Sequence, residues 1–289
     1  MPETLPLRPN IYRDPPDATR FSVVERPLPL WERAWNHGAL RKTVLLLLLA
    51  LTWQLYAMRL ANPLLIPTFL DTVAAFRDAI LTGGLLGKAW YSIRILLIGY
   101  AAGLALAAIL TTLAITSRIG TDLVETLTAM FNPLPAIALL PLALIWFGLG
   151  TGSLVFVLIH SVLWAVALNT HSGFMAVSNT LRMVGRNYGL RGLPYVAKIL
   201  VPAAFPSILT GLKIGWAFAW RTLIAAELVF GVSSGSGGLG WFIFENKNQL
   251  EIASVFAGLF SVILIGLAVE NIVFRTLAAR TVQRWGMQG

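Results

Sequence analysis

Long apolar runs separated by short polar segments dominate the chain from residue 41 onwards. A helix of about 20 apolar residues crosses the roughly 30 Å hydrocarbon core of a membrane. The pattern therefore predicts a series of membrane-crossing helices. Six are expected, at residues 43–62, 90–116, 136–147, 153–170, 208–230 and 252–276.

Shorter elements fill two of the segments between these runs. Residues 63–88 place apolar positions at helical spacing around a few charged ones, which predicts a short helix at the membrane interface. An amphipathic stretch begins at Asp122 and leads to Asn132-Pro133-Leu134-Pro135, where the prolines break or kink the helix before the third run.

Two of the runs carry small residues at every fourth position. This pattern lets two membrane helices approach closely, so we expect both faces to pack against other helices. The residues are Gly99, Gly103 and Ala107 in the second run, and Gly211, Gly215 and Ala219 in the fifth.

The first 40 residues have a different character, with seven prolines, scattered arginines and a few aromatic residues. This composition favours an extended tail that has no core of its own. The expected organisation is an N-terminal cytoplasmic tail over residues 1–40 and a six-helix membrane domain over residues 41–289.

Composition indicates an all-α integral membrane protein. Of the 289 residues, 57% are hydrophobic and only 12% are charged, which is far too apolar for a soluble domain of this size. The absence of cysteine excludes disulfides, thiolate metal sites and cysteine nucleophiles. The three histidines show no metal-ligand spacing, so no metal site is predicted.

The net charge of +9 is better explained by membrane topology than by nucleic-acid binding, because the basic residues are spread among the apolar runs. Cytoplasmic loops of membrane proteins carry an excess of Lys and Arg. With both termini inside, the inner segments hold fifteen of the 22 basic residues, the outer segments four and the spans three. We therefore expect both termini, and residues 179–206, to be cytoplasmic. Membrane lipid is an expected partner.

Residues 179–206 form the basic loop, the longest internal segment that is too polar to cross a membrane. It contains four basic residues and no acid. Glycines divide it and prolines close it, which predicts a short helix, a sharp turn and a second short helix. Without a partner protein, such a loop would only contact lipid headgroups.

In the basic loop, Gly189 is followed thirteen residues later by Pro202, after an apolar Ile199-Leu200-Val201 run. This frame resembles the cytoplasmic EAA loop of the permease subunits of ABC importers, in which a short helix docks on a separate ATPase subunit. Met183, Val184 and Gly185 stand where that motif has Glu-Ala-Ala. The residues that the resemblance assigns to the ATPase-coupling loop are Leu181, Arg182, Met183, Val184, Gly185, Arg186, Tyr188, Gly189, Leu190, Arg191 and Pro202.

From residue 41 to 285 the chain resembles the nitrate, sulfonate, taurine and bicarbonate group of these permeases. The resemblance implies the type I importer permease fold in a bacterial inner membrane. It also implies a second permease copy, two ATPase subunits and an extracytoplasmic solute-binding protein as partners. The chain has no phosphate-binding motif of its own, so ATP and Mg are expected on the partner ATPase, with no cofactor here and no catalytic residue.

The fifth run is the best candidate for a translocation path, because it contains ionisable groups that are costly inside a membrane. Lys213, Trp216, Trp220 and Glu227 share one face of the predicted helix. Arg221 lies near the middle of the run. Two interpretations of Arg221 stay open: a positive group that attracts an anionic solute, or half of an ion pair with a residue such as Glu227.

Two other classes of protein are less well supported. A secondary transporter driven by an ion gradient is the main alternative, although no inverted repeat and few acids in the spans are visible. A membrane-embedded enzyme would need paired carboxylates, a histidine cluster or a nucleophile arrangement, which the sequence lacks. The solute is expected to be a small anion such as nitrate, bicarbonate, a sulfonate or a carboxylate.

Overall fold

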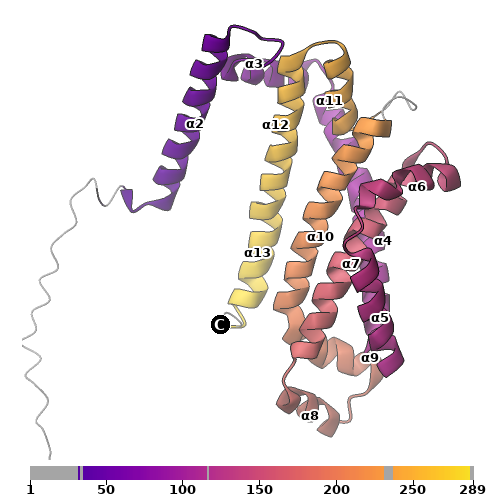
Figure 1. Ribbon diagram of the computed structural model, residues 1–289. Coiled ribbons are helices and arrows are strands. Elements are labelled where there is room, and N and C mark those ends of the chain that lie inside the picture. Colours follow the sequence, from indigo (N-terminus) through magenta and orange to yellow (C-terminus); the bar gives the residue numbers. More distant parts are fainter. Residues whose placement is uncertain (1–31, 33–34, 116, 231–236, 287–289) are drawn as a thin grey trace, which may run out of the picture. The chain divides into compact units, whose positions relative to one another are not determined.

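In the part of the chain that the structure describes, every regular element is a helix (Figure 1). The computed structural model describes residues 32, 35–115, 117–230 and 237–286. Most of the tail predicted over residues 1–40 therefore lies outside the described residues. The chain divides into two units, residues 1–52 and residues 53–289.

The predicted runs are helical, with ends that differ from the expected ones by several residues, because helix ends depend on caps and tertiary contacts that a hydropathy pattern does not contain. Short 3-10 (η2) and π (η3, η4 and η5) segments continue or join the α-helices. The elements are α2 (Gly38–Leu60), α3 (Phe69–Leu81), α4 (Leu85–Ala114), α5 (Arg118–Phe131), η2 (Ala136–Leu139), α6 (Leu140–Phe147), α7 (Thr151–Ala176), α8 (Asn179–Asn187), α9 (Gly192–Tyr195), η3 (Val196–Leu200), α10 (Val201–Phe230), α11 (Leu239–Asn248), α12 (Ile252–Ala268), η4 (Val269–Phe274), α13 (Arg275–Ala278) and η5 (Ala279–Gln283).

The described part of the first unit is mainly the beginning of α2, where five consecutive leucines from Leu45 to Leu49 are exposed. In the second unit, α3 is the helix predicted within residues 63–88. Thr68 and Asp71 form a capping box at its start. The Trp53 indole donates a hydrogen bond to the Pro67 carbonyl and its ring contacts Phe256 of α12.

The helix break predicted at residues 132–135 is confirmed. α5 ends at Phe131, and the chain bends by 88° before the η2–α6 segment. Pro133 and Pro135 cause the break, since proline has no N–H to donate and its ring clashes with the preceding turn. By length and composition, the described residues contain five helices that could cross a membrane, or six if the bent pair is one span.

The core of the second unit is built around α7, which packs between α4 and α10. Val162 of α7 is fully buried and faces a glycine on each side. A Cβ atom on Gly103 of α4 would lie 2.7 Å from the Val162 Cβ, and one on Gly215 of α10 would lie 3.5 Å from the Val162 Cγ1. The prediction that the small-residue faces of the second and fifth runs pack closely is confirmed.

The pairs of residues in contact give the direction of each helix. Gly99 faces Leu158 and Gly103 faces Val162, so α4 and α7 run parallel. The chain that connects two parallel helices must run back in the opposite direction. α5 does so, because Glu125 contacts His171 and Phe131 contacts Trp164, which makes α5 antiparallel to α7. α10 runs antiparallel to α7, since Gly211 faces Asn169 and Gly215 faces Val162.

The end of the basic loop differs from the prediction. Pro202 and Pro206 were expected to close a second short helix, but residues 192–229 form one continuous helical run through both prolines. The π segment η3 explains this, because the Val201 N–H bonds to the Val196 carbonyl, one residue further back than in an α-helix. The wider turn accommodates the proline ring that follows.

The segment between the fifth and sixth runs contains a helix, α11, that the hydropathy pattern did not predict. Gly238 caps α11, and Gly240 packs so closely on α10 that a Cβ there would lie 2.5 Å from the Glu227 Cβ. Sequence patterns missed α11 because its burial depends on this contact.

Candidate functional site

The predicted first helix of the basic loop is α8, and a glycine with positive φ ends it. The Ser178 hydroxyl caps its N-terminus by accepting a hydrogen bond from the Leu181 N–H. At its C-terminus, the Leu190 N–H donates to the Gly185 carbonyl, and Gly189 adopts φ +73°. This left-handed conformation favours glycine and closes the helix end.

α8 is held against the next helical segment by Gly185, whose Cα lies close to the side chains of Tyr195 and Ile199. A Cβ at position 185 would lie 2.9 Å from the Ile199 Cγ1. The position where the EAA motif has its second alanine is thus one where even a methyl group would require the neighbouring side chains to shift.

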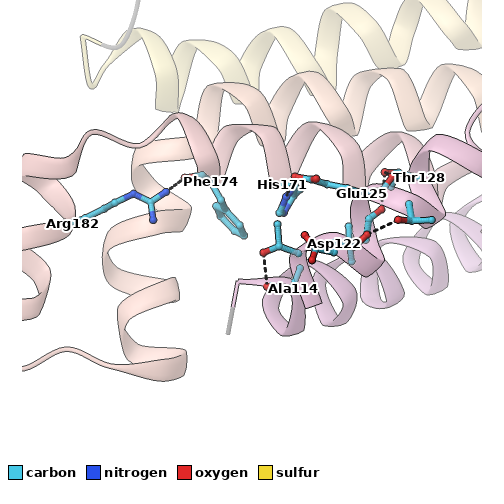
Figure 2. Close-up of polar contacts among 10 residues, drawn as sticks. Ala114, Asp122, Glu125, Thr128, His171, Phe174 and Arg182 are labelled. Carbon is cyan, nitrogen blue, oxygen red and sulfur yellow. Dashed lines mark hydrogen bonds and ion pairs between the residues drawn. The ribbon is translucent and has the colours of Figure 1, made fainter. Parts of the chain in front are cut away.

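Arg182 connects α8 to the end of α7 (Figure 2). Its guanidinium donates hydrogen bonds to the carbonyls of Phe174 and Val177, at the C-terminus of α7. The last carbonyls of a helix have no partner within the helix and carry partial negative charge, so an arginine there is favourable. A movement of α8 would consequently be transmitted to α7.

The opposite surface of the loop is exposed and combines apolar with basic side chains. Tyr188 is 82% exposed, Leu193 70% and Met183 56%. Exposed large apolar side chains at the tip of a soluble loop are typical of a protein-binding surface. The other exposed members are Leu181, Val184, Arg186 and Arg191.

The four residues predicted on one face of the fifth run do share a face of α10, and that face packs inside the chain. The Lys213 ammonium lies 3.2 Å from the Glu270 carboxylate of η4. Trp216 packs between Tyr100 and Phe274, and Trp220 donates to the Val262 carbonyl.

Glu227, the fourth member, holds α10 to two other helices. Its carboxylate accepts hydrogen bonds from the Ser92 hydroxyl of α4 and from the Gly240 N–H at the start of α11, at 2.8 and 2.9 Å. The Ser92 oxygen in turn accepts from the Leu239 N–H. These bonds fix the Glu227 carboxylate between α10, α4 and α11, and no ion pair joins it to Arg221 among the described residues.

Arg221 lies on a different face of α10. Its Nε donates to the Ala217 carbonyl one turn earlier, and the guanidinium lies over the Phe218 ring, 5.2 Å from the centroid. Its terminal nitrogens have no hydrogen-bond or acidic partner among the described residues. The side chain is exposed at the rim of a cavity.

The Arg221 cavity has a volume of about 360 Å³ and lies between α10, α7 and the break that follows α5. Phe131 and Trp164 stack at 5.1 Å on one side, with His160 edge-on to both. The Ser161 hydroxyl donates to the Thr222 hydroxyl, which joins α7 to α10. The lining residues are Phe131, Asn132, Pro133, Leu134, Pro135, Ala136, Ile137, His160, Ser161, Trp164, Phe218, Arg221, Thr222 and Ala225.

Of the sequence candidates, only Arg221 lines this cavity, and our sequence reasoning missed its main aromatic wall. His160 was considered only as a metal ligand, and Asn132–Pro135 only as a break. One signal was available: His160 and Trp164 are one helical turn apart on the same face of an otherwise apolar run.

One polar contact lies between the basic loop and the cavity (Figure 2). The Nε2 of His171, on α7, lies 3.4 Å from an Oε1 of Glu125, on α5. His171 is buried, whereas Glu125 is largely exposed. α5 ends at Phe131, which lines the cavity. The His171–Glu125 contact therefore joins α7, whose end is hydrogen-bonded to Arg182, to α5, which borders the cavity.

Several known proteins are similar to this chain over most of its length. A bicarbonate transport system permease protein of Synechococcus elongatus is 29% identical over 246 residues, covering 81% of this chain and 84% of the relative. A protein of Bacillus subtilis, provisionally named an aliphatic sulfonates transport permease, is 27% identical over 252 residues, 87% of this chain and 88% of that protein.

A protein of Methanocaldococcus jannaschii, provisionally named an ABC transporter permease, is 31% identical over 223 residues, covering 76% of this chain and 82% of the relative. Residues 99–285 match the family described as binding-protein-dependent transport system inner membrane component. The match contains α7, the basic loop, the Arg221 cavity and the long helices around them. This chain therefore belongs to that family, the multi-pass membrane permeases of ABC transporters, in the nitrate, sulfonate and bicarbonate group.

Proposed function

We propose that this chain forms the translocation path of an ATP-driven importer for a small anion. Two copies would pair in a bacterial inner membrane, bind two ATPase subunits and receive solute from an extracytoplasmic binding protein. The names of the relatives support an anion, since they include bicarbonate and sulfonate permeases. ATP and Mg would be held by the partner ATPase and would supply the energy for the conformational change.

Both termini and the basic loop are placed in the cytoplasm in this proposal. The fifteen-to-four distribution of basic residues supports this orientation. The parallel directions of α4 and α7 also support it, because the chain between them must cross once more, which makes six crossings in total. An ATPase could then reach the exposed apolar and basic surface of α8.

Alternating access would follow from a chain of contacts that begins at α8. Arg182 would pass a displacement of α8 to the end of α7. The Glu125–His171 contact would pass it to α5, which ends at the proline-rich wall of the Arg221 cavity. This arrangement links a cytoplasmic docking surface to the cavity, as an ATP-driven permease requires. A carrier driven by an ion gradient would have no use for the docking surface.

The single observation that carries the anion path is the free guanidinium of Arg221. An ionisable group within a membrane span is costly and is normally paired or functional. Arg221 has no acidic partner in the described residues and faces a cavity instead. Among the described residues, Arg221 is the one cation that lines the cavity, so an anion could be attracted without being held too tightly to leave.

Replacing Arg221 by glutamine should lower ATP-driven uptake of the anionic solute about tenfold, the effect of losing one charge-assisted interaction. The complex should stay assembled and keep its basal ATP hydrolysis, because no buried acid is stranded. Uptake, assembly and ATPase activity are measured on the same proteoliposomes. Arg94→Gln is the matched control, since Arg94 is an exposed arginine of α4 that does not line the cavity. Normal uptake by an intact Arg221→Gln complex would refute the path.

Replacing Gly189 by valine should impair assembly with the ATPase. A β-branched residue at φ +73° is strained by about 1–3 kcal/mol, so α8 would end differently and present another surface. Gly189→Asn is the control, because asparagine tolerates this conformation. Co-purification of the ATPase with each variant is measured, together with the amount inserted in the membrane. Equal co-purification of the valine and asparagine variants would contradict a docking role for the turn.

A further inference from the structure

The Arg221 cavity offers more than a positive charge. Both ring nitrogens of His160 and the indole Nε1 of Trp164 are buried and have no hydrogen-bond partner among the described residues. All three atoms belong to side chains that line the cavity, but the atoms themselves are enclosed by protein. His160 and Trp164 therefore present ring carbon to the cavity, which adds to its apolar surface.

The walls of the same cavity are largely apolar and aromatic. Phe131 and Trp164 are stacked at an angle of 17° and so offer a flat surface, and Phe218 lies below the Arg221 guanidinium. The Asn132–Pro135 break contributes two prolines and a leucine, which are rigid or apolar. Pockets with this mixture, in the range of about 300–1,000 Å³, typically bind small organic molecules.

These features distinguish between two kinds of anion. A nitrate or bicarbonate ion could meet the guanidinium, but it has no apolar part to cover the aromatic walls and would leave most of the 360 Å³ to water. An organic anion could place its oxyanion head at the terminal nitrogens of Arg221. Its apolar body would then lie on Phe131 and Trp164 and remove both from water, which is favourable.

We propose that the Arg221 cavity is a solute-selecting site in the permease itself, and that its ligand is an organic oxyanion with an apolar body. The proposal rests on the proposed function, because it assigns the solute of that path. Arg221 binds the charged head, and the Phe131–Trp164 stack binds the apolar body. Selection would then occur in this chain as well as in the binding protein.

The test uses benzenesulfonate as the probe and the permease–ATPase complex in nanodiscs, without the binding protein. Binding is measured by isothermal titration, with potassium nitrate and the neutral benzenesulfonamide as comparators at constant ionic strength. Benzenesulfonate should bind about tenfold or more tightly than nitrate, the effect of one aromatic contact of about 1.4 kcal/mol. It should also bind more tightly than benzenesulfonamide. Nitrate binding as tight as that of benzenesulfonate would overturn the proposal.

Two variants test which residue binds the apolar body of the ligand and which binds its charged head. Trp164→Leu should weaken benzenesulfonate binding and leave nitrate unchanged, whereas Arg221→Gln should weaken both anions and leave benzenesulfonamide unchanged. Trp90→Leu is the matched control, because Trp90 is an exposed tryptophan of α4 outside the cavity. An equal loss in Trp164→Leu and Trp90→Leu would overturn the site.

Failure of this proposal and of the proposed function can be told apart. ATP-driven nitrate uptake by a complex that does not bind benzenesulfonate would refute only the organic-anion site. If no ATPase associates with the chain, the proposed function fails, and the titration is made on the chain alone in nanodiscs. Benzenesulfonate binding that depends on Trp164 would then still support the site, and its absence would refute it.

Discussion

Replacing Gly103 by leucine is expected to leave little folded protein in the membrane. A Cβ at this position would already lie 2.7 Å from the Cβ of Val162 and 3.3 Å from the Ile159 carbonyl oxygen, so leucine cannot fit without separating α4 from α7. The Val162 Cβ cannot rotate away, because it is bonded directly to the backbone of α7, which packs on both α4 and α10. Overpacking of this kind costs about 1–3 kcal/mol, and more where backbone must shift.

The measurement is the yield of monodisperse protein after detergent extraction, together with its thermal inactivation temperature. Gly87→Leu is the matched control, because Gly87 lies in the same helix and a Cβ there would meet nothing within 4 Å. A second variant tests the cause: Val162→Gly, which removes the Cβ at 2.7 Å, should partly restore the yield of Gly103→Ala. Similar yields for Gly87→Leu and Gly103→Leu would mean that the close approach of α4 and α7 does not stabilise the fold.

Replacing Arg182 by alanine is expected to uncouple ATP hydrolysis from transport. The variant removes the hydrogen bonds to the Phe174 and Val177 carbonyls, which hold α8 to α7. Hydrogen bonds from a charged group are worth about 1.5–3 kcal/mol, so a loss of uptake of about tenfold or more is expected. The exposed docking surface is unchanged, so the ATPase should still bind and hydrolyse ATP.

ATP hydrolysis and uptake are measured together on reconstituted Arg182→Ala, and their ratio gives the coupling. Arg182→Lys should keep part of the coupling, since an ammonium can reach one carbonyl but lacks the planar fork of arginine. Arg280→Ala, which removes an exposed arginine elsewhere, controls for the loss of one positive charge. An unchanged ratio in Arg182→Ala would show that α8 transmits its movement by another route.

Neither experiment depends on the identity of the solute. The Gly103 variants test how the bundle is held together, and the Arg182 variants test whether the bundle receives movement from the basic loop. The basic loop is where this chain departs from the EAA pattern. One departure is Gly185, which stands in place of an alanine and packs directly on Ile199. Because residue 185 is a glycine, α8 packs more closely on the following helical segment than it could if a side chain were present at that position.

The sequence was sufficient for features that depend on neighbouring residues. Apolar runs predicted the long helices, since the hydrocarbon core sets the length of a crossing helix. Small residues at four-residue spacing predicted the packing faces of α4 and α10, because helical periodicity places them in one row. The turn at Gly189 was also predicted, and its positive φ is the reason that a glycine is suitable there.

The Arg221 cavity could not be predicted in this way, because its residues come from segments that are far apart in the chain. At 100° per residue, Arg221 lies about 120° around the helix from Glu227, which indicates that the two side chains lie on different faces. It does not reveal which face is internal. Ser92 and α11 occupy the Glu227 face, whereas the Arg221 face opens on a cavity.

The third span shows the same limit. The prolines predicted a break before the third run, but no local pattern contained the size of the bend, 88°, or the packing of α5 against α7. That packing depends on the stacking of Phe131 on Trp164 and on the contact of Glu125 with His171. Local patterns therefore predicted the elements and their packing faces, whereas contacts between distant segments created the cavity, the position of Arg221 in it and its link to the basic loop.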